Sequence, residues 1–417
     1  MPAELHLLNS MTRKKQKFVP RHPDGTVKIF TCGPSIYNWP HIGNYRTFLF
    51  EDILERYLDY LGYTVERLIN FTDMEDKAIA RANELGISLQ ELTRPVAEKF
   101  IQECEMFNIG LPDTIARSTT SAEQAVLLIR RLLENRTAYR HKGDIFYDPL
   151  KFKDFGKLFG LDMSRWPKKR IRFRKDTYPG QRWNLGDFIL WKKRRPSDGN
   201  IYWKTELGEG RPAWNIQDPA MITKHLGWEL DICCGGIDNI YRHHDYNIAV
   251  IEAISGKELA HFWLHGGHVR VGGKKMSKTR GNIVYFNDLL SRGFQPHHIR
   301  FFLIYGDYRE PLNMNTDRLN CARGKIETLR SMINRIEEQT MPAGRSTAEA
   351  ENLAGRLEPD FKDRMNDNLD VEAAFDRTYI NVSNLLDLAI KGHLGAGVLR
   401  ITQKRLARID GVLKILN

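Results

Sequence analysis

The chain has 417 residues, a length that exceeds one ordinary hydrophobic core and predicts two or three domains, or one large α/β unit with additions. Hydrophobic residues make up 41% of it, and no apolar run approaches the roughly 20 residues that a membrane span needs, so a membrane protein is excluded. The net charge of +11 favours a polyanionic partner.

The N-terminal segment and the cysteines indicate a cytoplasmic protein. Residues 1–18 lack the apolar core and small-residue cleavage site of a signal peptide, so we expect no export. Five cysteines spread over a long chain do not form a disulfide framework. We therefore expect each to be a free thiol or a ligand in a reducing compartment.

The first predicted elements form a βαβ unit. Residues 27–31 predict a strand, residues 64–70 predict a second one, and Gly62 predicts the end of the helix between them. Apolar residues recur at helical spacing in that helix: Phe50, Ile53, Leu54, Tyr57, Leu58 and Leu61. Because the crossover between such strands is right-handed, we expect a parallel sheet whose first loop opens at its carboxyl edge.

The later elements predict an interrupted sheet domain followed by helices. Residues 79–133 predict a series of helices with breaks near Gly86, Pro95 and Pro112. Residues 139–212 are short, aromatic segments separated by Gly and Pro, which predict an insertion between two halves of a sheet domain. The sheet is expected to resume at residues 229–233, and a helix to begin around His243 and end at Ile254. From residue 315 onward only helical patterns occur.

One stretch of the insertion has the composition of a nucleic-acid contact. Residues 165–195 contain twelve Lys or Arg and only two acidic residues, Asp176 and Asp187. Aromatic residues lie among them: Trp166, Phe173, Tyr178 and Trp183. Since such a mixture can hold phosphates and stack bases, the stretch favours RNA as a partner over a merely solvated basic surface.

Two motifs indicate nucleotide chemistry. HIGN, from His41 to Asn44, lies where a strand passes into a helix, and backbone N–H groups and the positive helix end favour a phosphate there. KMSKT, with Lys275 and Lys278, follows two glycines and predicts a mobile loop that closes on a triphosphate. A third stretch, RHHDYNIA, places His243 and Asn247 four residues apart, which is metal-ligand spacing on a helix.

These segments together resemble the cysteinyl-tRNA synthetase family of class I aminoacyl-tRNA synthetases. CGPSIYNWPHIGNYRTF is similar to the family's CGPT-Y-x3-HIGH-ART segment, and NFTDMEDKAIARANELGIS to its N-x-TDIDDKII-RA segment. GRPAWNIQDPAM resembles GRPGWHIECSAM, and GGIDNIYRHHDYNIA resembles GGIDL-FPHHENEIA. The similarity extends from about residue 28 to 325, and residues 361–375 resemble the family's helical bundle.

The resemblance implies an α/β fold, with a Rossmann-like class I core, a connective insertion and an all-α helical bundle. The expected division is as follows: residues 1–138 for the first half of the catalytic domain, 139–212 for the connective insertion, 213–280 for the second half with the KMSKT loop, 281–314 for the stem-contact region, and 315–417 for the bundle. The family's small C-terminal domain, which helps to read the anticodon, is expected to be missing after Asn417, so tRNA discrimination is expected to be reduced.

The resemblance also implies a ligase that uses ATP, with Mg²⁺ accompanying the nucleotide, to form an aminoacyl adenylate and transfer the acyl group to tRNA. The implied catalytic residues are His41, Asn44, Lys275 and Lys278. The implied ATP-binding residues are Gly43, Gly235, Gly236, Asp238, Met276 and Ser277. The implied amino-acid pocket contains Cys32, Thr72, Trp214, Asp218, His243 and Asn247.

Zinc is the cofactor for which this sequence departs from its family. The resemblance implies a zinc site at Cys32, Asp218, His243 and Asn247, where the family has two cysteines, a histidine and a glutamate. Only Cys32 and His243 keep those residue types. Whether zinc is bound therefore stays open; its ligands would be Cys32, Asp218 and His243. Without zinc, Asp218 would favour a hydroxyl, amide or ammonium group, so we expect activation to survive with the amino acid changed or thiol selection weakened.

Other acceptors and activities remain open at this stage. A sister branch joins cysteine to an amino sugar in mycothiol biosynthesis and is similarly short, so the acceptor could be a small amine instead of tRNA. A third hypothesis is a non-catalytic RNA-binding relative. The retained HIGN motif and the two lysines of KMSKT disfavour it. The oligomeric state stays open, with a monomer favoured.

Overall fold

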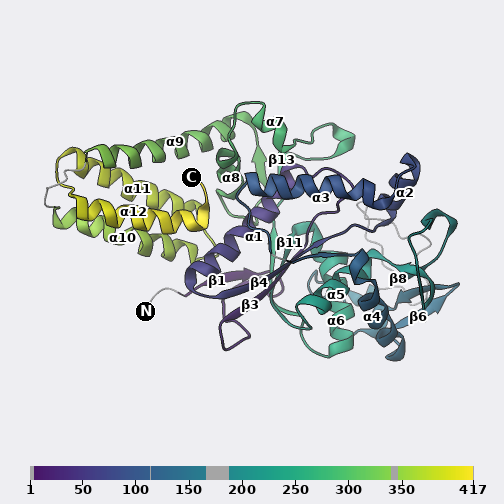
Figure 1. Ribbon diagram of the computed structural model, residues 1–417. Helices are drawn as coiled ribbons and strands as arrows, with labels where there is room; N and C mark the ends of the chain where they lie inside the picture. Colours follow the sequence, from purple (N-terminus) through teal and green to yellow (C-terminus); the bar gives the residue numbers. More distant parts are fainter. Residues whose placement is uncertain (1–3, 113, 166–186, 340–345, 417) are drawn as a thin grey trace.

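The computed structural model describes residues 4–112, 114–165, 187–339 and 346–416. Within these ranges it contains a parallel sheet with helices on it, a second sheet, a small third sheet and a helical bundle (Figure 1). None of the helices in the described ranges is long and apolar enough to cross a membrane.

The central sheet has five parallel strands in the order β12-β11-β3-β4-β5. Their bounds are β3 Thr26–Thr31, β4 Thr64–Phe71, β5 Ile115–Arg117, β11 Leu230–Gly236 and β12 Ala260–Gly266. The order reverses where β3 pairs with β11, and such a switch point is where open α/β sheets bind ligands, beyond the carboxyl ends of the strands.

The predicted βαβ unit is confirmed as β3, α1 (Ile42–Leu61) and β4. Gly62 ends α1 with a φ of 93°, a left-handed conformation that glycine adopts without strain. α1 is buried on several sides, including Leu49, Ile53 and Tyr57, and the Tyr57 hydroxyl donates to Asn366 of the bundle. The apolar residues that recur at helical spacing in the sequence are buried in α1, except Leu61, and polar residues such as Glu51 and Asp52 are buried beside them.

The helices between β4 and the insertion are α2 (Asp76–Leu85), α3 (Leu89–Met106) and α4 (Ala122–Glu134). The predicted break at Gly86 is confirmed, but the break at Pro95 is wrong, because Pro95 lies inside α3. Ser88 and Glu91 form a capping box that starts α3, and Phe100 is fully buried by its packing. Tertiary burial thus outweighs the lost backbone hydrogen bond of Pro95.

The predicted insertion contains a second sheet in the order β6-β7-β8-β10-β9. Its strands are β6 Ala138–His141, β7 Asp144–Tyr147, β8 Phe188–Lys193, β9 Trp203–Thr205 and β10 Gly208–Pro212. Neighbouring strands in it are antiparallel. Residues 166–186, which include most of the basic, aromatic stretch, lie outside the described residues.

The second half of the core contains α5 (Trp214–His225), β11, α6 (Asp245–Ser255) and β12, followed by α7 (Phe286–Leu290) and α8 (Pro296–Ile304). A small sheet in the order β14-β13-β15 holds the segment before the KMSKT motif. Its strands are β13 Val269–Val271, β14 Lys274–Lys275 and β15 Leu312–Met314. At the N-terminus, β1 (His6–Asn9) and β2 (Lys14–Lys17) form a hairpin that the sequence patterns did not predict.

The prediction of helices after residue 315 is confirmed. The bundle consists of α9 (Thr316–Gln339), α10 (Ala348–Met365), α11 (Val371–Ile390) and α12 (Ala396–Leu413), and it lies beside the α1 and α8 side of the core (Figure 1). Buried apolar residues run without interruption from the α1 face of the sheet into the bundle.

Candidate active site

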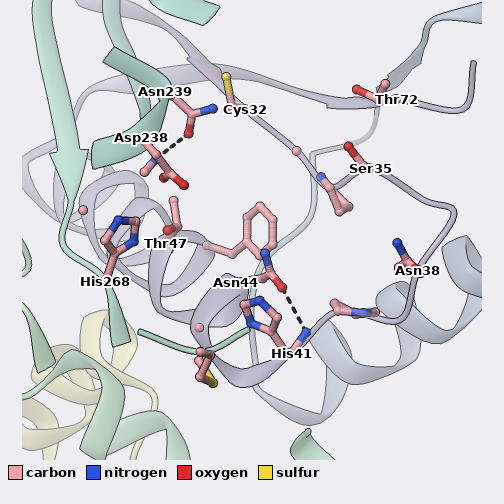
Figure 2. A pocket seen from close by; sticks show the side chains of 18 of the residues that line it. Cys32, Ser35, Asn38, His41, Asn44, Thr47, Thr72, Asp238, Asn239 and His268 are labelled. Carbon is pink, nitrogen blue, oxygen red and sulfur yellow. Dashed lines mark hydrogen bonds between the residues drawn. The ribbon is translucent and has the colours of Figure 1, made fainter. Parts of the chain in front are cut away.

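A cavity of about 550 Å³ opens beyond the carboxyl ends of β3, β4 and β11. It lies at the switch point of the central sheet, and Figure 2 shows side chains from several elements directed into it. Most of the residues predicted for the site line this cavity: Cys32, His41, Gly43, Asn44, Thr72, Trp214, Asp218, Gly236, Asp238, His243, Lys275, Met276 and Ser277.

The HIGN motif forms the start of α1. His41 is the residue that precedes the helix, and the Asn44 side chain accepts a hydrogen bond of 2.9 Å from the His41 backbone N–H (Figure 2). Burial lowers the pKa of His41, and its Nδ1 has no hydrogen-bond partner within the described residues. A neutral imidazole at a helix N-terminus can therefore donate to a phosphate or ribose oxygen.

Gly43 brings this helix start close to the KMSKT motif. A Cβ atom at Gly43 would lie 2.7 Å from Met276 Cε and 3.1 Å from His41 Cε1. A Cβ there would displace the Met276 methyl group and crowd the His41 ring, so glycine favours the close packing of two motifs that are separated by more than 200 residues in the sequence. The side-chain contacts, and not only the chain order, place HIGN and KMSKT at one cavity.

The KMSKT segment is held in place by Asn282. The Asn282 side chain accepts from the Ser277 backbone N–H at 2.9 Å and donates to the Lys275 carbonyl at 3.3 Å. The Lys275 ammonium lies 3.2 Å from His268 Nε2 and 3.6 Å from Asp238 Oδ2. The side chain of Lys278 lies outside the part that the structure describes.

Asp238 and Gly236 lie opposite the HIGN motif. The Asn239 side chain accepts a 2.8 Å hydrogen bond from the Gly236 N–H, which fixes the loop after β11 (Figure 2). Burial acts to raise the pKa of Asp238, but His268 and Lys275 outweigh it, so the pKa lies below its usual value. Asp238 is therefore an anion that can accept hydrogen bonds from ribose hydroxyls.

The other end of the cavity contains a fixed carboxylate. Asp218 on α5 is 7% exposed, and its Oδ1 accepts a 2.9 Å hydrogen bond from Asn70 Nδ2. Its Oδ2 lies 3.6 Å from His243 Nδ1, and the His243 ring packs on Trp214 with 4.9 Å between ring centroids. Asn70 is itself held because its Oδ1 accepts from the Gly33 N–H at 2.7 Å.

Cys32 takes part in a buried chain of polar contacts. Its Sγ lies 3.2 Å from His244 Nε2, His244 Nδ1 lies 2.8 Å from His265 Nε2, and His265 Nδ1 lies 2.8 Å from Ser10 Oγ. Burial, and then the charge of Asp218, raise the pKa of the Cys32 thiol, while burial lowers the pKa of His244. A neutral thiol donating to His244 starts a chain in which each imidazole donates onward, ending at Ser10.

Asn247 and Gly235, both predicted for the site, do not line the cavity. Asn247 is 2% exposed and is not among the cavity-lining residues, and its Nδ2 has no hydrogen-bond partner within the described chain. The two residues with non-helical backbone angles, Tyr241 and Arg242, both precede His243, and of the pair expected to share a helical face only His243 lines the cavity. Gly235 lies beside the cavity, where a Cβ would meet His244 Cε1 at 3.0 Å.

The expected zinc ligands do not form a metal site. Asn247 offers an amide that is a poor zinc ligand and does not line the cavity, and Cys32 is engaged with His244. In the described ranges, the one group of three His, Cys, Asp or Glu ligand atoms within 4.8 Å of one another is His297, His298 and Glu327, far along the chain in α8 and α9. The residues at the cavity therefore do not fit zinc.

The group of His297, His298 and Glu327 is already in contact with a positively charged side chain, Arg330. Arg330 Nη1 donates a 3.0 Å hydrogen bond to His297 Nε2, and His298 Nε2 lies 2.7 Å from Glu327 Oε1. His298 Nδ1 accepts from the Gln295 N–H, which leaves its proton on Nε2. These contacts describe a structural ion-pair network between α8 and α9.

Several residues of the site were not singled out from the sequence. Asn70, His244, His268 and Asn239 contact predicted site residues, and His265 contacts His244. Asn70 stands in the NFTDMEDK segment and His244 in RHHDYNIA, so the signal was present in motifs already recognised. What the sequence lacked was the direction of each side chain.

Comparisons with known proteins agree on one family. The family model for the catalytic domain of class I (C) tRNA synthetases matches residues 18–324. A cysteine–tRNA ligase of Chlamydia pneumoniae is 35% identical over 414 residues, which cover 99% of this chain and 86% of the relative. A cysteine–tRNA ligase of Solibacter usitatus is 34% identical over 412 residues, which cover 99% of this chain and 87% of the relative.

A solved structure supports the fold. Methionyl-tRNA synthetase of Mycobacterium tuberculosis, in complex with methionyl-adenylate, superposes with a TM-score of 0.68 at 15% identity, covering 93% of this chain and 92% of that one. At this identity the likeness concerns the fold alone. The family match, the two relatives and the joining of HIGN and KMSKT at one cavity all lead to the same conclusion: the chain belongs to the cysteine–tRNA ligase family of class I aminoacyl-tRNA synthetases, a family of ligases.

Proposed function

We propose that this chain activates an amino acid with ATP and transfers the aminoacyl group to tRNA. The names of its relatives state that they ligate cysteine to tRNA. In the first step the amino-acid carboxylate attacks the α-phosphorus, forming the aminoacyl adenylate and releasing pyrophosphate. In the second, a ribose hydroxyl at the 3′ end of the RNA attacks the acyl carbon and releases AMP. Both steps depend on positioning and charge stabilisation more than on covalent catalysis by the protein.

ATP is proposed to lie across the start of α1. His41, Gly43 and Asn44 would contact the phosphates, since the helix N-terminus and the absent Cβ of Gly43 leave room for them. Gly236 and Asp238, with Gly235 behind them, would face the ribose and base. Mg²⁺ would accompany ATP as part of the substrate.

The KMSKT loop is proposed to stabilise pyrophosphate as it leaves. The Lys275 ammonium is exposed and is held near Asp238 and His268 in this structure, so it can turn toward a triphosphate at the cavity mouth. Met276 and Ser277 line the same wall, and Lys278 is assigned to this loop from the sequence motif. A cation at this place lowers the energy of the transition state as negative charge moves to the leaving group.

The amino acid is proposed to occupy the opposite end of the cavity, between Thr72, Trp214 and Asp218. Cysteine is the amino acid that the names of the relatives give, and it is the reference substrate for the tests below. The single observation that carries the proposal is that one cavity joins the start of α1, the KMSKT loop and this pocket.

A matched pair of lysine variants tests the assignment. Lys275→Ala should lower amino-acid-dependent pyrophosphate exchange by about 100-fold, the usual loss when one charge-stabilising group is removed. Lys274→Ala removes the neighbouring lysine of the same short strand and should change exchange by less than about twofold. Equal exchange by the native protein and Lys275→Ala would refute the role of the loop.

The acceptor is tested separately from activation. Total tRNA should accept the radiolabelled amino acid, and small amines such as glucosamine derivatives should not replace it. Charging of an amine with no charging of tRNA would support the biosynthetic alternative. RNA binding without exchange would support the non-catalytic alternative.

A further inference from the structure

We propose that the pocket reads the amino-acid side chain directly through the Asp218 carboxylate, without zinc, and that the preferred substrate has a hydrogen-bond donor, a hydroxyl or an ammonium group, on its Cβ. This inference rests on the proposed function, because it names the substrate class of the same site. It departs from the names of the relatives, which give cysteine.

The first support is the chemistry of the four positions where the family holds its metal. Asn247 contributes an amide in place of a charged ligand, and it is buried away from the cavity wall. Asp218 contributes a carboxylate where the family has a thiolate. The set is both harder and less charged than a zinc cage of two thiolates, an imidazole and a carboxylate.

The second support is where the remaining two side chains point. The Cys32 thiol contacts His244 at 3.2 Å, and His244 is tied in turn to His265, so a metal at Cys32 would break a connected buried network. The His243 ring lies against Trp214 and presents Nδ1 to Asp218 at 3.6 Å. Within the described residues, no three of these ligand atoms converge.

The third support is the state of Asp218. Its Oδ1 is used by Asn70, whose own position is fixed by Gly33, so the carboxylate is held in one orientation. Among the residues that the structure describes, the polar contact of its Oδ2 is the longer one with His243, and Asp218 lines the cavity. A fixed anionic acceptor in a partly desolvated pocket favours a substrate group that donates, and a side chain without a donor would leave it unpaired.

The size of the substrate follows from the pocket walls. Thr72 and Trp214 are the residue types that the cysteine family has at these places, and both line the cavity. We therefore infer a side chain of about cysteine's length. Serine and 2,3-diaminopropionate have this length and carry a donor on Cβ, whereas 2-aminobutyrate has the length and no donor.

The test uses these isosteres with the purified full-length protein. Pyrophosphate exchange is measured with serine, 2,3-diaminopropionate, cysteine and 2-aminobutyrate, before and after incubation with a zinc chelator, and zinc is quantified by mass spectrometry. We expect kcat/KM for one of the two donor substrates to exceed that for cysteine at least tenfold, no use of 2-aminobutyrate, no effect of the chelator and less than about 0.1 zinc per chain. A preference for cysteine that the chelator abolishes, with about one zinc per chain, would overturn the inference while leaving the proposed function intact.

A pair of substitutions provides a readout that does not depend on activity. Asp218→Cys together with Asn247→Glu restores the family's residue types; it should abolish the preference for the donor substrate, and zinc content should stay below about 0.1 per chain, because residue 247 does not line the cavity and Cys32 contacts His244. Cys321→Ser, at an exposed cysteine outside the cavity, is the control and should change neither. About one zinc per chain in the native protein contradicts the inference, and circular dichroism confirms that both are folded.

Asp218→Asn keeps the shape of the pocket and removes its charge. It should lower kcat/KM for the preferred donor substrate about 100-fold or more and leave that for cysteine within about threefold. Unchanged selectivity would overturn the inference. If no amino acid supports exchange in any variant, the proposed function and the inference both fail, and the zinc content still separates a metal pocket from a metal-free one.

Discussion

Glu75 is a buried carboxyl group beside the candidate pocket. It precedes α2, is 5% exposed, and its Oε1 has no hydrogen-bond partner in the described part of the chain. Burial raises its pKa to about 7, although Lys77 opposes the rise. The folded protein therefore holds a proton on Glu75 over a pH range in which the unfolded chain has released it.

This difference predicts a pH-dependent stability. Between about pH 4.5 and pH 7 the folded state binds more protons than the unfolded state, so the contribution of Glu75 falls as pH rises and is constant above about pH 7. Glu75→Gln should therefore be more stable than the native protein at pH 8, by about 3 kcal/mol. The gain should shrink toward zero at pH 5.

Urea denaturation at pH 5 and pH 8 measures the effect. Glu84→Gln, on the exposed side of the same helix, is the control and should stay within about 0.5 kcal/mol of the native protein at both values. If Glu75→Gln is equally destabilised at pH 5 and pH 8, the ionised carboxylate of Glu75 does not destabilise the folded protein at neutral pH.

At the residue scale, motifs could be predicted from the sequence but contacts could not. His41, Asn44 and Lys275 were found because they stand in short, specific patterns at a strand–helix junction and on a loop. The bond between Asn70 and Asp218 joins residues 148 positions apart, so no local pattern contains it. The engagement of Cys32 with His244, instead of His243, depends on the irregular backbone before α6.

Among the elements, α1 and α8 are joined by a fully buried ion pair. Arg300 Nη2 lies 2.6 Å from Asp52 Oδ2, and both side chains are fully buried. Arg300 also donates to the carbonyls of Phe107 and Leu413, which connects the end of α3 and the end of α12 to the same group. Burial opposes ionisation of Asp52, but Arg300 and Arg56 outweigh it and hold its pKa below the usual range.

Breaking this pair should be costly, because Arg300 would remain charged in a buried place. Asp52→Asn is expected to lower the free energy of unfolding by about 3–5 kcal/mol, measured by urea denaturation at pH 7. Glu98→Gln breaks an exposed pair with Arg94 on α3 and should cost less than about 1 kcal/mol. Similar losses for the two variants would mean that the buried pair does not hold α1 and α8 together.

The sequence predicted helix ends well where the backbone requires a left-handed residue, and poorly where tertiary packing determines whether a helix continues. Gly62 and Gly86 were correct ends because a left-handed residue there is a local requirement. Pro95 was read as a break, although packing of Phe100 keeps α3 continuous across it. The short strand β5 was read as part of a helical series, since three residues carry too little periodicity to identify a strand.

In the whole molecule, the bundle and the catalytic core share one hydrophobic core. A single cluster of buried residues includes Leu49 and Ile53 of α1 and Leu385 and Leu406 of the bundle. The Tyr57 hydroxyl donates to Asn366 Oδ1 at 2.7 Å across this junction. The two parts are therefore expected to unfold together.

Two spectroscopic probes can test this. All eight tryptophans precede residue 264, so their fluorescence reports on the catalytic part, whereas circular dichroism at 222 nm reports on all helices, including α9 to α12. We expect the two urea transitions to coincide, as in a two-state unfolding. Transitions with separated midpoints would show that the bundle is an independent folding unit.

The division of the chain into catalytic halves, insertion, stem-contact region and bundle stays a prediction. The order of strands and helices could be read from the sequence because α/β and all-α patterns differ in periodicity. The switch point at β3 and β11 required the pairing of strands that are 200 residues apart. The cavity lies at the carboxyl ends of these two paired strands, so its position could not be predicted without the pairing.

The central claim is that this cavity forms an aminoacyl adenylate. Its most direct measurement is exchange of labelled pyrophosphate into ATP by the purified protein, with and without amino acid and in the absence of tRNA. We predict exchange that requires an amino acid and falls about 100-fold in Lys275→Ala. Exchange that never depends on an amino acid, with binding of ATP intact, would contradict the claim.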